Sequence, residues 1–329
     1  MIPYEWLEQA GERIAPHIRN TPLTYDPMHE LYLKWENHQV TGSFKARGAL
    51  NKVLTLQDWE LERGLVTASA GNHGQGVALA AGIKHAHVTV FVSAHASANK
   101  IEAMRALGAE IHFVAGGYAE AESTGISFAR STEATWVSPY NDGLVIAGQG
   151  TIGTEVLSEL PNPTQVTWLV PAGGGGLVSG IGSALQRLQP HPRLLAVQSE
   201  ASPFLHAIFH RGTQEGVIEL PSLADGLSGP VETGSVTIPM VREYVDDVIL
   251  VTEGEIRQAI KFAWLTYHEC IEGSAAVVLA AVLLGRVKFR PAVAILTGGN
   301  ILAEEHAQII NDPSLKLLQA ERADGNSAG

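Results

Sequence analysis

Cysteine is almost absent from this chain, which has one such residue, Cys270, among 329. A single cysteine excludes an intrachain disulfide and fits the reducing cytoplasm, where we expect the protein to reside. The chain also lacks an apolar run of the roughly 18 residues needed to span a bilayer. Its N-terminus has neither the basic start nor the apolar stretch of a secretory signal. We therefore expect no membrane partner.

An excess of basic residues is missing as well. The formal net charge is −12, and no basic stripe interrupts the acidic balance. This charge argues against nucleic acid and against anionic membranes as partners. Apolar residues make up 45% and charged residues 17%, which is typical of a soluble globular protein with one large domain or two intimate ones.

Strand and helix patterns alternate from about residue 64 onward. Short β-branched runs end in glycine or small polar residues, and longer amphipathic segments follow them. This repetition predicts an α/β fold with parallel sheets that carry helices on both faces. The expected strands are 64–68, 88–92, 111–114, 166–170, 194–197, 248–251 and 292–296, and the expected helices include 75–81, 99–107, 118–130 and 177–188.

Four consecutive glycines, Gly173-Gly174-Gly175-Gly176, separate an expected strand from an expected helix. Such a turn aims several N–H groups at one point, and the helix dipole adds about half a positive charge there. We interpret it as a phosphate cradle. A plain flexible turn is the simpler alternative. A dinucleotide loop is another, with Gly180 completing a loose glycine motif and Glu200 as a ribose-binding acid, and it would indicate a nicotinamide-dependent oxidoreductase.

A second strand-to-helix junction is Ser69-Ala70-Gly71-Asn72-His73-Gly74. N–H groups at a helix start favour an anion, and the side-chain donors here indicate a carboxylate rather than a phosphate. The alternative for any one of these residues is a structural helix cap.

Lys45 follows Gly42-Ser43-Phe44, a tight turn with an aromatic ring that excludes water. Burial beside such a ring disfavours the ammonium form and frees the amine for imine chemistry. Most of the other lysines are in contexts that indicate solvated faces; they are Lys34, Lys52, Lys84, Lys100, Lys261, Lys288 and Lys316.

A fourth segment, Thr297-Gly298-Gly299-Asn300, directly follows the expected strand 292–296. The carboxyl end of a strand is where an α/β sheet presents groups to a ligand, although the segment also fits a plain turn.

These four segments, in this order, resemble the fold type II pyridoxal-phosphate enzymes, and specifically the serine/threonine dehydratases. The likeness is strongest over residues 31–50 and covers roughly residues 10–310. It implies a tryptophan synthase β-like fold with two doubly wound parallel-sheet domains. Residues 1–47 and 144–329 would form the large domain and 48–143 the small one. A homodimer is also implied.

The resemblance implies a role for each cofactor-binding residue. Lys45 would form the imine with pyridoxal 5'-phosphate and then move the substrate α-proton. Phe44 would flank the ring, Asn72 would bind its hydroxyl, and Thr297 would contact the pyridine nitrogen. The phosphate would rest on Gly173, Gly174, Gly175, Gly176 and Leu177.

On the substrate side, Ser69, Ala70, Gly71 and His73 would surround the carboxylate. Ala70 stands where serine racemases of the family have a second serine, so dehydration is favoured over racemisation. Tyr140 replaces a phenylalanine or asparagine and would reshape the substrate pocket.

The cation site of some family members is not expected, because Gln198 and Phe204 stand where two acids would be. The pair His85 and His87 has no further ligand nearby in sequence, so we predict no metal site. Nothing after the last expected helix would form a regulatory domain, which suggests an enzyme without feedback control.

The leading hypothesis is β-elimination from L-threonine or L-serine, which gives a 2-oxo acid and ammonia. Rival hypotheses with the same cofactor are serine racemase, hydroxyaspartate or phenylserine dehydratase, and threonine synthase. A ligand-binding protein without catalysis is a further alternative.

Overall fold

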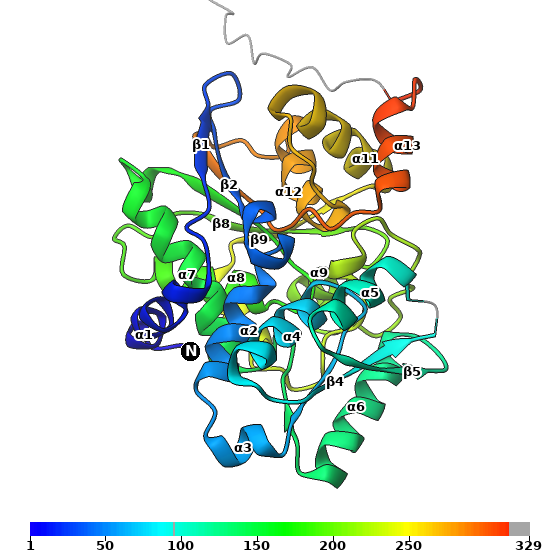
Figure 1. Cartoon of the computed structure of the whole chain (residues 1–329). Helices are drawn as coiled ribbons and strands as arrows, with labels where there is room; N and C mark the ends of the chain where they lie inside the picture. Colours follow the sequence, from blue (N-terminus) through cyan, green and yellow to red (C-terminus); the bar gives the residue numbers. More distant parts are fainter. Residues whose placement is uncertain (95, 316–329) are drawn as a thin grey trace, which may run out of the picture.

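Two β-sheets organise the chain, of which the computed structural model describes residues 1–94 and 96–315 (Figure 1). The larger has six strands in the order β1-β2-β10-β7-β8-β9, and the smaller has four in the order β5-β4-β3-β6. All pairs are parallel except β1 with β2. The strands are β1 Leu23–Asp26, β2 Leu31–Trp35, β3 Leu65–Ala68, β4 Val88–Ser93, β5 Glu110–Val114, β6 Thr135–Trp136, β7 Thr167–Pro171, β8 Leu194–Ser199, β9 Asp247–Val251 and β10 Ala292–Leu296.

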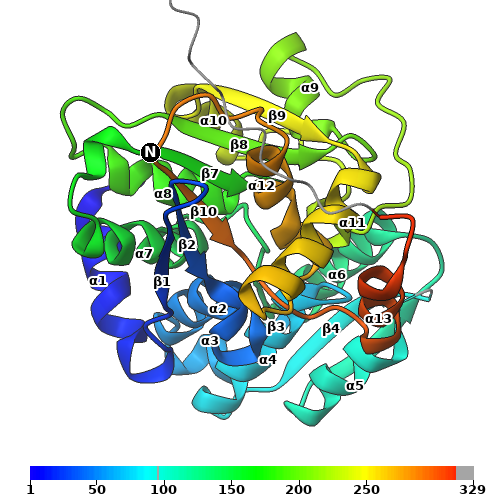
Figure 2. The ribbon, with the colours of Figure 1, turned by 90° about the horizontal axis from the view of Figure 1, so that it is seen from above.

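The central strands of the six-stranded sheet, β10, β7 and β8, are buried on both faces because they are apolar at most positions. Along β7, Trp168 and Val170 point to one face, while Leu169 points to the other. The first face is covered by α7 Gly143–Glu159, α8 Gly176–Leu185, α9 Phe204–Arg211 and α10 Thr237–Tyr244. The second is covered by α11 Glu253–Phe262, α12 Gly273–Leu283 and α13 Ala303–Asn311. Figure 2 shows these two layers on either side of the sheet.

The four-stranded sheet is built in the same way. Val88 and Val90 of β4 face α2 Lys45–Leu54, α4 Asn72–Lys84 and α5 Ala98–Ala106, and Phe91 faces α6 Tyr118–Thr132. Helix α2 also packs on α7, so it lies between the two sheet units. The remaining elements are α1 Tyr4–Ile14, α3 Asp58–Glu62, the short 3₁₀ helices η1 Ala15–His17, η2 Glu36–His38, η3 Val40–Gly42, η4 Pro163–Gln165 and η5 Asp225–Leu227, and the π-helix η6 Ala263–Tyr267.

The predicted fold class is confirmed: two parallel α/β sheets with helices on both faces. The sequence patterns missed the hairpin of β1 and β2, which adds an antiparallel edge strand. The helix expected over 177–188 ends at Leu185. Lys316 and the tail 323–329 lie outside the described residues. None of the described helices is long and apolar enough to cross a membrane.

Both ligand loops expected from the sequence lie where strand order reverses. In the larger sheet, the chain proceeds from β7 to β8 and β9 on one side, whereas β10 lies on the other side of β7. The glycine loop after β7 and Thr297 after β10 therefore flank one crevice. In the smaller sheet, β4 and β6 lie on opposite sides of β3, so residues 69–74 and 137–140 flank a second crevice. Such crevices are the usual ligand sites of open α/β sheets.

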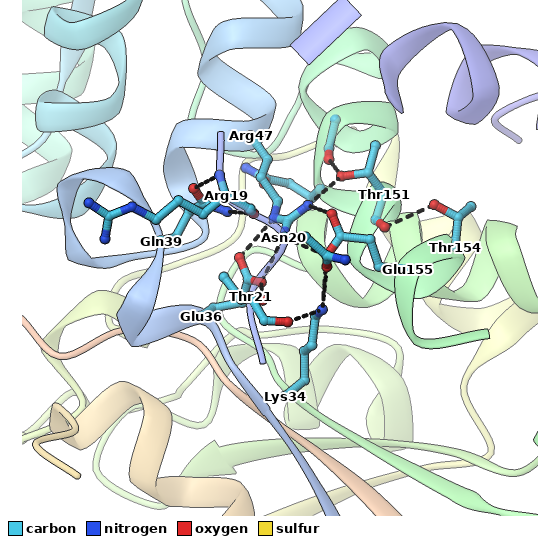
Figure 3. Close-up of polar contacts among 12 residues, drawn as sticks. Arg19, Asn20, Thr21, Lys34, Glu36, Gln39, Arg47, Thr151, Thr154 and Glu155 are labelled. Atoms are coloured by element: carbon cyan, nitrogen blue, oxygen red, sulfur yellow. Dashed lines mark hydrogen bonds and ion pairs between the residues drawn. The ribbon is translucent and has the colours of Figure 1, made fainter. Parts of the chain in front are cut away.

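A buried ionic network holds α2 between the two units (Figure 3). The Arg47 guanidinium donates to both carboxylate oxygens of Glu36 and to both of Glu155, at 2.6–2.9 Å. Lys34 pairs with the same Glu155 at 2.9 Å and donates to the carbonyl of Thr21 at 2.7 Å. The prediction that Lys34 is solvated was therefore wrong, because its side chain is fully buried against a carboxylate.

Candidate active site

Lys45 is the first residue of α2 and lies between the two crevices. The turn before it is fixed by Phe44, whose N–H donates to the carbonyl of Thr297 at 3.0 Å. The Lys45 amine donates to the carbonyl of Pro139 at 3.1 Å and lies 5.3 Å from the centre of the Phe44 ring. Its neighbours thus come from both sheet units.

The electrostatic setting of Lys45 destabilises its ammonium form. Although Lys45 is not fully buried, the surrounding protein desolvates the ammonium and lowers its pKa from 10.5 to about 8. The negative field of Glu272 partly offsets this effect. An amine with a pKa near 8 is available as a nucleophile and base close to neutral pH, which is the property that imine chemistry requires.

The glycine loop has no room for side chains. A Cβ on Gly173 would stand 2.9 Å from the Cα of Leu227, and a Cβ on Gly174 would stand 2.5 Å from the Tyr140 ring. Gly175 has a φ of +86°, and α8 begins at Gly176. Glycine is therefore needed for both space and backbone conformation, and the loop directs the first N–H groups of a ten-residue helix toward the crevice.

The second loop leads into α4, which begins at Asn72. The Ser69 hydroxyl accepts from the N–H of Gly71 at 3.2 Å, which fixes the turn. A Cβ on Gly76 would stand 3.1 Å from the carbonyl carbon of Lys45, so this helix start packs against the start of α2.

His73 differs from its expected role. Its Nε2 lies 3.0 Å from the Val137 carbonyl, which accepts only a hydrogen, so the proton is on Nε2. Burial and the nearby Lys45 cation lower its pKa to about 3, so the ring is neutral and its buried Nδ1 has no proton to donate. The His73 side chain therefore does not donate to a carboxylate; its main-chain N–H, in the first turn of α4, has that capacity.

Sequence reasoning missed Glu272, a carboxylate that is 6% exposed. Its Oε1 accepts from Asn72 at 2.8 Å, and Asn72 in turn accepts from Asn300 at 2.7 Å. Burial raises the pKa of Glu272 to about 7, and the nearby Asp225 adds to this effect. The available sequence signal was an acid directly before the uncharged run 273–283, which is also the pattern of an ordinary helix start.

Thr297 fits the role of a partner for a ring nitrogen. Its hydroxyl is buried at the end of β10 and has no hydrogen-bond partner among the described residues. A buried polar atom without a partner costs free energy and points to a group that the chain itself does not supply. An amine of lowered pKa, a side-chain-free anion cradle and this hydroxyl together fit a phosphorylated pyridine aldehyde.

Tyr140 closes the crevice between the loops. Its ring packs on Gly174, and its hydroxyl accepts from the N–H of Glu232 at 2.9 Å. Burial raises the pKa of this hydroxyl above its usual value, so it remains protonated at neutral pH.

A lysine amine of lowered pKa between two strand-to-helix loops, at the switch points of two parallel sheets, is the arrangement expected of an enzyme that forms an imine on a phosphorylated aldehyde. The chain belongs to the pyridoxal-phosphate dependent enzyme family, whose model matches residues 14–298. The family resemblance and the predicted cofactor, pyridoxal 5'-phosphate, are thereby confirmed.

Several proteins are similar to this chain over nearly its whole length. L-threonine ammonia-lyase of Thermotoga maritima is 40% identical, with 96% of this chain and 80% of that protein covered. Among solved structures, maize serine racemase superposes with a TM-score of 0.85 at 31% identity, covering 93% of this chain and 96% of that one. The processed form of threonine deaminase isoform 2 from Solanum lycopersicum gives a TM-score of 0.84 at 28% identity, covering 93% of this chain and 92% of that one.

Proposed function

We propose that this enzyme deaminates L-threonine, and L-serine as a second substrate. The β-hydroxyl leaves as water, and hydrolysis of the released enamine takes up one water again and gives a 2-oxo acid and ammonia. The observation that carries the proposal is the Lys45 amine, whose pKa is lowered to about 8 between two anion-binding loops. The likeness to L-threonine ammonia-lyase over nearly the whole chain supports the choice of substrate.

In this proposal, the main-chain N–H groups of residues 173–177 would hold the cofactor phosphate. Phe44 would flank the ring, Asn72 would bind its hydroxyl, and the Thr297 hydroxyl would contact its nitrogen. Pyridoxal phosphate, when bound, supplies an electron sink for negative charge at the substrate α-carbon. A neutral hydroxyl at Thr297, in place of a carboxylate, leaves the ring nitrogen free of a partner that would keep it protonated.

The chain's own residues perform the remaining steps. Ser69 and the N–H groups at the start of α4 hold the substrate carboxylate, with Ala70 and Gly71 leaving room for it. The Lys45 amine accepts the α-proton on its own face. On the opposite face Ala70 has no group that moves a proton, which supports loss of the β-hydroxyl over racemisation. Tyr140 limits the space for the substrate side chain.

A substrate panel tests this proposal. L-threonine, L-serine, D-serine, 3-hydroxyaspartate and phenylserine are incubated with the cofactor-loaded enzyme, and 2-oxo acid and ammonia are quantified. We expect L-threonine to have the highest kcat/KM and to give 2-oxobutanoate and ammonia in equal amounts. Formation of D-serine from L-serine without pyruvate would instead support a racemase, for which the similarity to maize serine racemase is the specific observation.

We also propose the domain limits 1–47 with 144–329 and 48–143, a homodimer, and a cytoplasmic location. The strands of the smaller sheet all fall within 65–136, and those of the larger sheet fall outside 48–143. Light scattering coupled to size exclusion tests the assembly, and limited proteolysis near residues 48 and 143 tests the domain limits.

A further inference from the structure

An ion pair joins the two sheet units at the mouth of the cleft. Lys100, in α5 of the smaller unit, donates from its amine to a carboxylate oxygen of Asp225, in η5 of the larger unit. The Lys100 side chain is 21% exposed and that of Asp225 58%. The bond thus lies at the edge of the cleft, and none of the proposed chemistry uses it.

Each end of this pair lies near one of the ligand loops, which are the carboxylate loop (residues 69–74) and the phosphate loop (residues 173–177). The Cδ of Lys100 lies 3.9 Å from the place of a Cβ on Gly71, in the carboxylate loop. Asp225 is two residues before Leu227, whose backbone lies against Gly173 of the phosphate loop. The turn that carries Asp225 is anchored to α12, because the N–H of Gly226 donates to the Ser274 hydroxyl at 3.0 Å. The pair therefore ties one ligand loop to the other.

The charge of Lys100 is secured by its surroundings. Desolvation lowers its pKa, but the charge and the hydrogen bond of Asp225 outweigh this loss, and the fields of Glu272 and Glu305 add to them. The pKa of Lys100 is therefore raised, so it remains a cation wherever the enzyme is active. Lys45 differs from Lys100, because it has no bonded carboxylate and its pKa is lowered. Lys45 is therefore suited to react in the cleft, and Lys100 to hold it.

We propose that Lys100 and Asp225 are positioning residues that clamp the cleft shut over the bound amino acid. The clamp favours the closed arrangement in which both loops face Lys45, and it contributes to substrate affinity rather than to the chemical step. The inference rests on the proposed function for its substrate, an α-amino acid. Since partly exposed ion pairs contribute up to about 1 kcal/mol, the expected effect on affinity is at most about fivefold.

The first experiment compares Lys100→Met with Lys52→Met in the cofactor-loaded enzyme. Lys52 forms the matched pair with Asp142 at 2.8 Å, with side chains 17% and 19% exposed, but neither residue touches a ligand loop in our site. We expect Lys100→Met to raise the KM for L-threonine by up to about fivefold with kcat within about twofold, and high salt to remove the difference from wild type. Lys52→Met retains the wild-type KM. Equal KM values in wild type and Lys100→Met at low salt overturn the clamp.

Two further measurements do not depend on turnover. Binding of L-alanine, which has no β-hydroxyl to lose, is followed by the change in cofactor absorbance and weakens by the same factor in Lys100→Met. Hydrogen exchange of the amides in 69–74 and 98–106 becomes faster in that variant, by up to about fivefold. If wild type fails to deaminate L-threonine, the proposed function fails, while hydrogen exchange still tests the clamp; unchanged exchange overturns it.

A charge reversal separates clamping from direct contact of Lys100 with the substrate carboxylate. The double variant Lys100→Asp with Asp225→Lys rebuilds the pair in the opposite order. A clamp predicts slow exchange again and a KM closer to wild type than in Lys100→Asp alone. A KM in the double variant as high as in Lys100→Asp would overturn the clamp and assign Lys100 to the substrate itself.

Discussion

Lys45 and Arg47 are two residues apart at the start of α2, and the protein treats their charges in opposite ways. Four hydrogen bonds from Arg47 reach Glu36 and Glu155. These carboxylates outweigh desolvation and raise the pKa of Arg47 still further. Lys45 donates to a neutral carbonyl and feels Glu272 only through space, so its pKa falls to about 8. Desolvation acts on both residues, so it does not distinguish the reactive one. The two residues differ because Arg47 has bonded carboxylates and Lys45 has none.

Helical geometry explains how both environments arise from one short segment. Residues two apart on an α-helix point roughly 200° away from each other, so they face different neighbours. Arg47 points toward η2 and α7, where the network of Figure 3 holds the helix. Lys45 points instead toward the carbonyl of Pro139. The hydrogen bonds of Arg47 fix the start of α2, and they thereby fix the position of Lys45.

Replacing Lys45 with alanine gives the largest expected effect. We expect 2-oxobutanoate release to fall by at least about a thousandfold, because no other described side chain in the site supplies an amine to the α-proton. The urea unfolding midpoint does not fall, since removing Lys45 also removes a desolvated cation. Lys52→Ala is the control and retains activity. Residual turnover above a tenth of wild type would disprove the role of Lys45.

Replacing Arg47 with methionine has the reverse signature. The change leaves Glu36 buried and without its cation, and we expect unfolding to become easier by about 3–5 kcal/mol. Urea unfolding monitored by circular dichroism measures the loss. Arg47→Lys is the matched variant: it retains the charge but loses the paired hydrogen bonds, so its loss should be smaller. Equal losses in the two variants would show that the geometry of the guanidinium, rather than its charge, is what the network requires.

Much of the fold could be predicted from the sequence because its strands are short apolar runs bounded by glycine. Both loops were found for a similar reason: glycine runs between a strand and a helix have a conformational meaning that is local. The hairpin of β1 and β2 was missed, since Lys34 within it is typical of a solvated segment until its partner Glu155, far along the chain, is known.

Glu272 was missed because its environment comes from distant segments. Asn72, Asn300 and Asp225 surround it, and no spacing in the sequence brings them together. For the same reason, Lys45 could be distinguished from the other lysines by its turn, but its freedom from bonded carboxylates could not be predicted.

The pH dependence of stability sharpens the comparison further. The pKa of Lys45 falls from 10.5 to about 8 on folding, so the unfolded chain binds more protons between these values. Stability therefore rises with pH across this window, and below pH 8 the full cost, about 3 kcal/mol, is present. In cofactor-free protein, Lys45→Met should be more stable than wild type at pH 7.5, and the difference should shrink by pH 10. Urea unfolding at both pH values measures it; a difference that does not change with pH would mean that the Lys45 pKa is not lowered.

Replacing Glu272 with glutamine has the smallest expected effect and tests the field that acts on Lys45. The amide retains an acceptor for Asn72, so the arrangement of the site persists, but the negative charge that raises the Lys45 pKa is gone. We expect the Lys45 pKa to fall below that of wild type, as measured by the pH dependence of its reductive methylation in cofactor-free protein.

The same variant also changes the pH profile of catalysis. Because Glu272 has a pKa of about 7, wild type should show an additional titration near that value in the pH profile of kcat/KM, and Glu272→Gln should lose it. The loss in kcat should be about tenfold, equivalent to about 1.4 kcal/mol. An unshifted Lys45 pKa would mean that the carboxyl is already protonated beside the amine, and that desolvation alone sets the pKa of Lys45.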